Sequence, residues 1–172
     1  AAYANLHPEI RQVADLLVVG GKGWGGVNVE GLSAQHGVAD RVKTLGYVND
    51  QQLSVLYSKA LFLAMPSLYE GFGLPLVEAM ARGIPVLTSN LSSMPEIAGE
   101  AAVFVDPKSI ESISSGLRKL LVDEALRRLL GEVGRKQACL FSWDITARKT
   151  LDVFHQAVAI KCPPNKMHEL DC

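Results

Sequence analysis

The sequence predicts a mostly parallel, doubly wound α/β sheet with additional helices at its C-terminal end. Short apolar runs of strand length alternate with segments of helical periodicity, which is typical of a parallel sheet. The first run is continuously apolar, as in strands covered on both faces. With 172 residues and 48% hydrophobic content, the chain can form one domain with a packed core.

Five strands are predicted along the first two thirds of the chain. The first, residues 16–19, is closed by Gly20 and Gly21, and we expect it to be buried on both faces. The third is stopped by Pro66. The other four predicted strands cover residues 42–48, 61–65, 85–87 and 102–105.

Capping residues mark the predicted helices. Asn49 and Gln52 hold the two positions of a capping box before a helix at 50–60. Pro75 opens a helix that runs to about residue 82, with Gly83 as its stop. The last third of the chain is predicted as three helices, at 109–121, from a cap at Asp123 to about 139, and from a cap at Ser142.

Composition excludes several classes of function. The net charge is −1, and lysine and arginine are scattered, so a nucleic-acid footprint is absent. No apolar run reaches the ~18 residues of a membrane span, and no secretory signal is evident. Cys139, Cys162 and Cys172 form no paired motif, which favours idle thiols in the cytoplasm over a zinc site. No acidic pair or histidine cluster indicates a metal.

The loop GGKGWGG follows the first predicted strand. Gly21, Gly23 and Gly26 satisfy the dinucleotide pattern G-x-G-x-x-G, but a helix precedes this strand, and no acidic residue ends the next one. A nicotinamide or flavin site is therefore the least favoured interpretation. A solvated glycine turn and contact with some other nucleotide, with Lys22 as phosphate partner, both stay open.

The segment YEGFGLPLVE places Glu70 and Glu78 around a glycine turn. Pro75 suits the first turn of a helix, whose free amides, with glycines beside them, form an anion site. Glu78 lies one turn into that helix and leans back over the loop. Carboxylates repel phosphate but accept hydrogen bonds from hydroxyls. Phosphate on the amides and hydroxyls on the carboxylates describe a nucleotide sugar, and two solvated glutamates are the alternative.

The stretch SLYEGFGLPLVEAMARGIPVLTSNLSSMPEIAGEAAVFVDP resembles the donor-binding half of retaining glycosyltransferases of family 4. The similarity extends to RVKTLGYVNDQQLSVLYSKA upstream and FSWDITARKTLDVF downstream, over roughly residues 8–158. The resemblance implies the C-terminal, Rossmann-like half of a GT-B fold.

The resemblance also implies a role for each matching residue. Glu70 would contact hydroxyls of the transferred sugar and stabilise the charge that develops at its anomeric carbon. Glu78 would hold the ribose hydroxyls, and Tyr47 and Val48 would receive the base. Backbone amides would bind the sugar and diphosphate, namely those of Gly71, Phe72, Gly73 and Leu74. Such enzymes retain the anomeric configuration without a cofactor or bound metal.

Two departures from the family pattern suggest a piece of a longer protein. The acceptor domain is missing, and so is the donor half's first strand with the Arg and Lys that grip the diphosphate. The chain also lacks an initiator Met. We expect a donor-binding domain at 1–160 without its first strand and a disordered tail at 161–172. The lost strand would lie between the strands ending at Val19 and Met65, and the two unpaired edges could take another chain.

The expected activity is transfer of a hexosyl group, to a saccharide or lipid-linked acceptor, by a cytoplasmic enzyme that is peripheral at the membrane face when full-length. The GGKGW and SNLSSMPE segments are more similar to mannosyltransferases, so GDP-mannose or a UDP-sugar is the expected donor. The fragment alone should be inactive. Two alternatives stay open: another GT-B enzyme (a nucleotide-sugar epimerase or glycosyl phosphorylase) and a non-catalytic nucleotide-binding or interaction domain.

Overall fold

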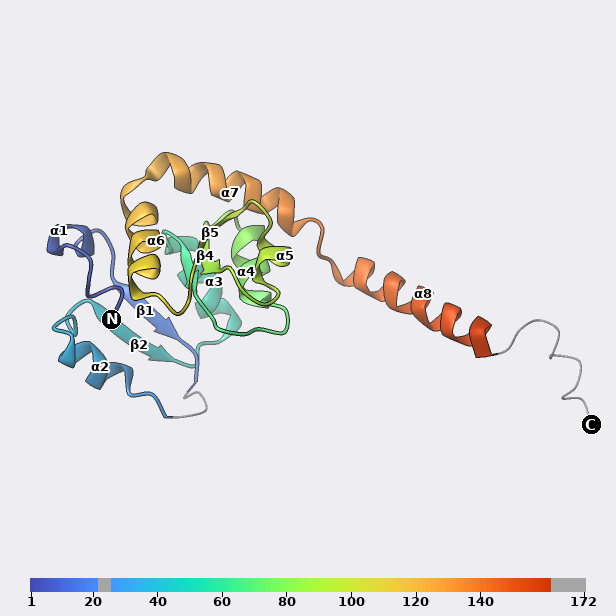
Figure 1. The fold of residues 1–172 in the computed structure, drawn as a ribbon, viewed down its shortest axis with the longest axis horizontal. Helices are drawn as coiled ribbons and strands as arrows, with labels where there is room; N and C mark the ends of the chain where they lie inside the picture. Colours follow the sequence, from blue (N-terminus) through green and yellow to red (C-terminus); the bar gives the residue numbers. More distant parts are fainter. Residues whose placement is uncertain (22–25, 162–172) are drawn as a thin grey trace, which may run out of the picture. The chain divides into compact units, whose positions relative to one another are not determined.

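The structure, a computed structural model, describes residues 1–21 and 26–161. The chain divides into two compact units, Ala1–Ala138 and Cys139–Cys172. The first unit contains the strands β1 to β5 and the helices α1 to α7, and the second contains α8 (Figure 1).

Parallel strands form two sheets in the first unit. One pairs β1 (Leu16–Val19) with β2 (Val42–Gly46), and the other has the order β3 (Leu63–Met65), β4 (Val86–Ser89), β5 (Ala102–Val105). The parallel α/β prediction is confirmed. β2 ends two residues earlier than predicted, because Gly46 has a φ of 66° and leaves the extended conformation.

The predicted caps begin the predicted helices. Asn49 accepts a hydrogen bond from the Gln52 amide at 2.9 Å, and the Gln52 side chain accepts one from the Asn49 amide at 3.0 Å. Asp123 accepts from the Leu126 amide at 2.8 Å. The helices of the first unit are α1 (Pro8–Arg11), α2 (Val29–Gln35), α3 (Asp50–Lys59), α4 (Leu74–Ala81), α5 (Met94–Ala98), α6 (Ile110–Val122) and α7 (Glu124–Ala138).

Two of these helices, α2 and α5, were not predicted. Both are short, with 7 and 5 residues, so neither develops an apolar period long enough to be recognised. α2 begins because the Asn28 side chain accepts a hydrogen bond from the Gly31 amide at 2.8 Å.

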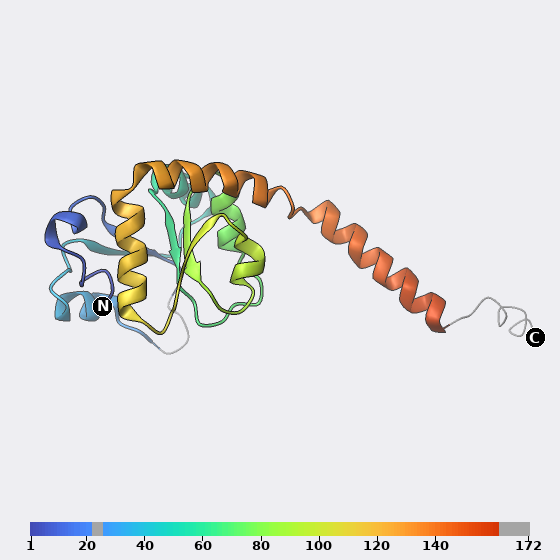
Figure 2. The ribbon, with the colours of Figure 1, turned by 45° about the horizontal axis from the view of Figure 1, so that its top comes forward.

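The main core surrounds β4, in which all four residues are buried. α4 and α6 lie on opposite sides of this strand in both ribbon views, which is the doubly wound arrangement (Figures 1 and 2). α4 contributes the buried residues Leu76, Ala79 and Met80, and α6 contributes Leu117, Leu120 and Leu121. α7 packs against α4 and α6.

The expectation that β1 is buried on both faces is wrong. Leu17 and Val19 are 44% and 40% exposed. Among the described residues, β1 pairs only with β2 and β3 only with β4. β1 and β3 therefore form no hydrogen bonds with each other, and a groove separates them. The groove has a volume of about 920 Å³ and is lined mainly by apolar side chains of β1, β3, α3 and α6.

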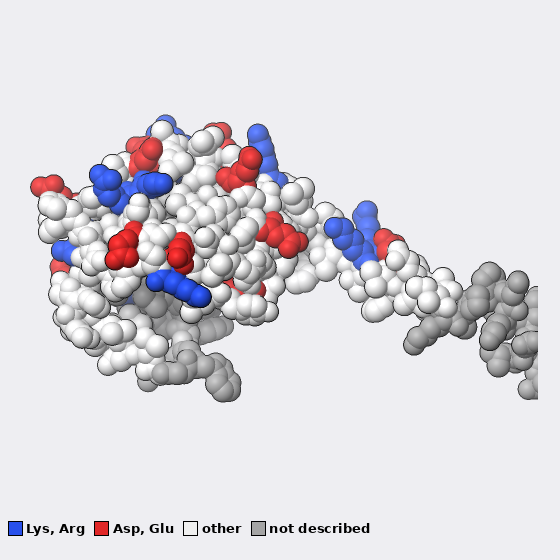
Figure 3. Space-filling model, viewed as in Figure 1, with Lys and Arg blue, Asp and Glu red and all other residues white. Residues whose placement is uncertain are grey.

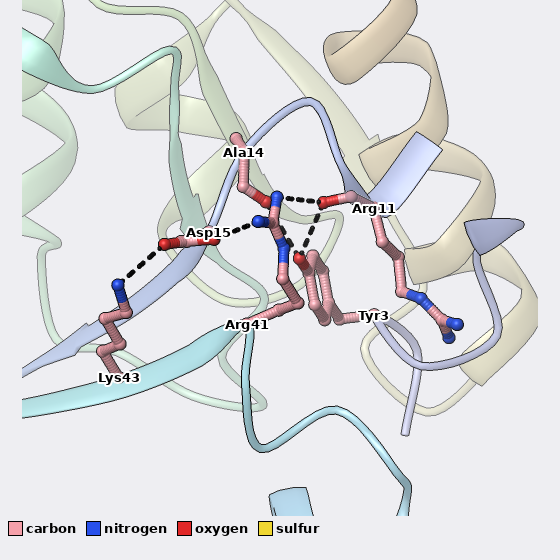
Figure 4. Close-up of polar contacts among 6 residues, drawn as sticks. All are labelled: Tyr3, Arg11, Ala14, Asp15, Arg41 and Lys43. Carbon is pink, nitrogen blue, oxygen red and sulfur yellow. Dashed lines mark hydrogen bonds and ion pairs between the residues drawn. The ribbon is translucent and has the colours of Figure 1, made fainter. Parts of the chain in front are cut away.

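Hydrogen bonds join the N-terminal segment to the residues just before β1 and β2 (Figure 4). The carboxylate of Asp15 lies 3.1 Å from Arg41 Nη1 and 3.0 Å from Lys43 Nζ. The hydrogen bond from Lys43 outweighs the opposing effect of burial and, with the charge of Arg41, holds the pKa of the Asp15 carboxyl below its usual range. The Tyr3 hydroxyl donates to the carbonyl of Ala14 at 2.9 Å. These contacts stabilise the amino ends of β1 and β2, at the opposite end of the sheet from the carboxyl ends of the strands.

The second unit contains α8 (Trp143–Lys161), which begins after Ser142 as predicted. The Ser142 hydroxyl oxygen accepts a hydrogen bond from the Ile145 amide at 3.1 Å. No helix in the described part of the chain is long and apolar enough to cross a membrane. Residues 162–172 of the predicted tail lie outside the described residues.

We predict that Gly131→Ala destabilises the first unit. A Cβ at Gly131, on α7, would lie 2.4 Å from the backbone oxygen of Gly83, so helix and turn would have to separate. Overpacking of this kind costs about 1–3 kcal/mol, more than the ~1 kcal/mol that alanine gains in a helix. Urea unfolding measures the difference. The control is Gly134→Ala in the same helix, where the nearest atom, Met80 Cγ, would be 3.3 Å away. Equal stability of the two variants would contradict the prediction.

Candidate functional site

The candidate site lies at the carboxyl ends of β3 and β4. The loop between β3 and α4, residues 66–73, carries Glu70, and the loop between β4 and α5, residues 90–93, meets it. Both loops leave the same edge of the sheet because the strands are parallel, and ligands of doubly wound sheets bind at this edge.

Glu70 is held by three serines. Ser67 Oγ donates to the Glu70 carboxylate at 2.9 Å. Ser92 Oγ lies 2.7 Å from the Glu70 carbonyl oxygen and also accepts from the Glu70 amide at 3.3 Å. Ser93 Oγ lies 3.1 Å from the same carbonyl and 3.0 Å from the carbonyl of Phe72. Sequence reasoning missed all three serines. Ser92 and Ser93 are distant from Glu70 along the chain, whereas Ser67 is only three residues from it but lies in a loop without a periodic pattern.

The N-terminus of α4 follows Glu70 directly. Gly73 is its N-cap residue and has no side chain with which to cap the helix. Pro75 has no N–H, and the Leu76 amide donates to the Gly73 carbonyl at 2.9 Å. It is therefore the amide of Leu74 that an outside acceptor can bind at this helix start. The φ of 103° at Gly73 favours glycine, and a Cβ would lie 2.8 Å from Met94 Cε. Of the four residues whose amides were predicted to bind donor, Gly71, Phe72 and Leu74 are exposed and Gly73 is buried. Pro75 lies in the first turn, as predicted.

Glu78 lies on α4 and is half-buried. Its Oε2 accepts a hydrogen bond from the hydroxyl of Tyr57, on α3, at 3.3 Å. The Arg82 guanidinium lies 5.0 Å from the centre of the Tyr57 ring, and its Nη1 donates to the Glu78 carbonyl at 2.9 Å. Burial, and then the negative charge of Glu78, raise the pKa of the Tyr57 hydroxyl to about 12. From the sequence, position 57 falls within the helix predicted at 50–60 and has no predicted role in the site.

Two further predicted site residues follow the two-stranded sheet. Tyr47 and Val48 follow β2, and Tyr47 is 84% exposed while Val48 is half-buried. Lys22 and Gly23 lie outside the described residues. α2 begins at Val29 and not directly after Gly26, which departs from the dinucleotide fingerprint, where the glycine turn opens the helix.

The arrangement can bind a ligand with both an anionic part and hydroxyl groups. The amides at the α4 N-terminus suit an anion, and the carboxylates of Glu70 and Glu78 on either side suit hydroxyls. Basic and acidic side chains are interspersed over the face of the first unit in Figure 3, without a region of one sign.

Comparison with known proteins finds similarity over most of the chain. The model of a family described as glycosyl transferases group 1 matches residues 1–137. The chain is 36% identical over 153 residues to O-antigen chain mannosyltransferase B of Escherichia coli, covering 89% of this chain and 40% of that protein. It is 39% identical over 134 residues to the MMP alpha-(1->4)-mannosyltransferase of Mycolicibacterium hassiacum, covering 76% and 33%.

Among solved structures, sucrose-phosphate synthase from Thermosynechococcus elongatus matches with a TM-score of 0.77 and 30% identity. The match covers 92% of this chain and 43% of that one. The chain thus spans less than half the length of each of these three proteins.

The raised pKa of Tyr57 predicts an unusual alkaline titration. Subtracting the ultraviolet titration of Tyr57→Phe from that of the unmodified chain should leave one phenol with a midpoint near 12. The same subtraction in the Glu78→Gln background, with and without Tyr57→Phe, should give a lower midpoint because the charge of Glu78 is removed. The midpoint should still exceed 10, because burial is the larger cause of the raised pKa. Since the folded pKa is raised, the stability from this group is complete below pH 10 and is lost as pH rises toward 12. A midpoint near 10 in the first difference would contradict the structure.

Proposed function

Because this chain belongs to the glycosyl transferases of group 1, and has the Rossmann-like fold of the C-terminal half of GT-B glycosyltransferases, we propose that it is the donor-binding half of a hexosyltransferase. The full-length enzyme would move a hexosyl group from a nucleotide diphosphate sugar to a saccharide or lipid-linked acceptor, with retention, as in family 4. The observation that carries the proposal is the pair of carboxylates beside the uncapped N-terminus of α4.

Each carboxylate keeps one oxygen for the ligand. Ser67 holds Oε1 of Glu70, which leaves Oε2 to accept a hydroxyl of the transferred sugar and to face the positive charge at its anomeric carbon. Tyr57 holds Oε2 of Glu78, which leaves Oε1 for the ribose hydroxyls. The diphosphate and sugar lie on the amides from Gly71 to Leu74, and the base lies at Tyr47 and Val48.

We propose a mannosyl donor, with GDP-mannose as the first candidate and a UDP-sugar as the second. Two relatives at 36% and 39% identity are mannosyltransferases by name, which supports this choice. Because the chain spans 40% and 33% of them, we expect the 172-residue chain to bind donor without turnover. The absence of a cofactor or catalytic metal and a location in the cytoplasm, peripheral to the membrane in the full-length protein, stay predictions.

Titration calorimetry of the chain with GDP-mannose, GDP, UDP-glucose and UDP tests the proposal. Either GDP-mannose and GDP or UDP-glucose and UDP should bind. Glu78→Gln should weaken the binding of both compounds of that pair about 5- to 30-fold, which corresponds to one or two kcal/mol of lost hydroxyl contacts. Glu132→Gln, an exposed glutamate on α7, is the matched control and should change nothing. No binding of any of the four compounds would favour a non-catalytic interaction domain.

The groove between β1 and β3 favours a second property, self-association. The amides of Leu16 and Gly20 donate to residues at the ends of β2, and alternate residues of a strand bond to the same side. Leu17 and Val19 therefore direct their backbone groups toward the groove. By the same alternation Ala64 does so from β3, since Leu63 bonds to Pro85. We propose that a second copy covers the groove, because it supplies the matching donors and acceptors and buries the same apolar lining. Since Tyr57 and Glu78 line the groove as well, dimer formation and donor binding at Glu78 would compete.

Sedimentation velocity over a range of concentrations tests self-association. The chain should form a dimer whose fraction rises with concentration, and Leu17→Lys should shift it toward monomer, because a lysine on an edge strand opposes pairing. Val55→Lys is the control, since Val55 is 61% exposed on α3 and does not line the groove. A monomer at every concentration would overturn this proposal and leave donor binding untouched.

A further inference from the structure

Ser92 has a backbone conformation that needs an explanation. Within residues 1–21 and 26–161 it is the one non-glycine residue with positive φ, at 58°. L residues with a side chain are strained in this left-handed region. Strain of this kind persists only where the surroundings impose it, and it concentrates at functional sites.

The Ser92 side chain contacts both the amide and the carbonyl group of Glu70. The Ser92 hydroxyl lies 2.7 Å from the Glu70 carbonyl oxygen as donor and 3.3 Å from the Glu70 amide nitrogen as acceptor. Both peptide groups of Glu70 are therefore fixed by one side chain from another loop. Ser67 then holds the carboxylate itself, so backbone and side chain of Glu70 are each restrained.

Stability alone does not account for these contacts. Ser92 is exposed and buries little surface, and the polar groups of Glu70 that it contacts could bind water instead. The net gain in folding free energy from such exchangeable hydrogen bonds is small, whereas the strain opposes folding. What the contacts do provide is a fixed position for Glu70.

We propose that Ser92 is a positioning residue that holds Glu70 for the transferred sugar. The ligand assigned to Glu70 rests on the proposed function. Glu78 is held separately, by Tyr57. Ser92 therefore acts on the sugar end of the donor and not on the nucleotide end, so it sets how much more tightly the site holds a nucleotide sugar than the free nucleotide.

Ser92→Ala and Ser92→Gly separate position from stability, because both lose the hydroxyl and only glycine relieves the strain. The glycine variant should melt about 2–4 °C above the alanine variant. Both variants should bind the nucleotide sugar (GDP-mannose, or UDP-glucose if the chain binds UDP compounds) more weakly. The loss relative to the free nucleotide should be the same ~3- to 10-fold in both. Ser58→Ala, whose exposed hydroxyl bonds within α3, is the control. A loss that follows the melting order, or that is equal for nucleotide sugar and free nucleotide, would overturn the proposal.

Hydrogen exchange without ligand gives a readout that does not depend on the proposed function. The Glu70 amide donates to Ser92 Oγ, so it should exchange at least about 10-fold faster in both variants, while amides of α4 keep their rates. Unchanged exchange at Glu70 would overturn the positioning role. If the unmodified chain bound neither pair of compounds, the donor assignment would fail, and the exchange result would still decide whether Ser92 holds Glu70.

Discussion

The burial of α4 against β3 and β4 is the constraint on which the site depends. Leu76, Ala79 and Met80 are fully buried, so the helix has one position relative to the sheet. That position fixes its uncapped N-terminus at the carboxyl ends of the strands and sets Glu78 against Tyr57 of α3. At Gly73 an added Cβ would lie 2.8 Å from Met94 Cε, so the end of the loop that carries Glu70 packs closely against α5. The chemistry of the site therefore follows from the apolar face of one helix.

The two sheets differ in how they are supported. The sheet of β3, β4 and β5 is covered on both sides by α4 and α6, whereas the sheet of β1 and β2 is joined to the rest across an apolar groove. The ion pairs of Asp15 tie the beginnings of β1 and β2 to each other. Local cooperativity should differ accordingly, with amides of β4 opening less readily than those of β1.

Local signals in the sequence predicted much of the fold. Asn49, Asp123 and Ser142 were recognised as caps because a capping contact spans only three residues. The end of β2 was missed because nothing in its apolar pattern announces the left-handed Gly46. The exposure of Leu17 and Val19 was missed because burial depends on what lies beside β1, which its own sequence does not reveal.

For the candidate site, the sequence indicated the two glutamates and the glycine turn, which adjoin in the chain. It did not reveal the residues that hold them. Tyr57 is 21 positions from Glu78, and Ser92 is 22 positions from Glu70, and neither pair has a spacing that a helix or strand would mark. Such partners become visible only when strands and helices are assembled.

The serine contacts across the two loops also bear on protein engineering. The segment YEGFGLPLVE is not a self-contained module, because the backbone of its first glutamate is anchored by residues 92 and 93. A chimera that exchanged this segment alone between homologous enzymes would transfer the carboxylates without their anchor. Under the proposed function, donor preference would have to be transplanted as two loops together, from neighbouring strands of the sheet.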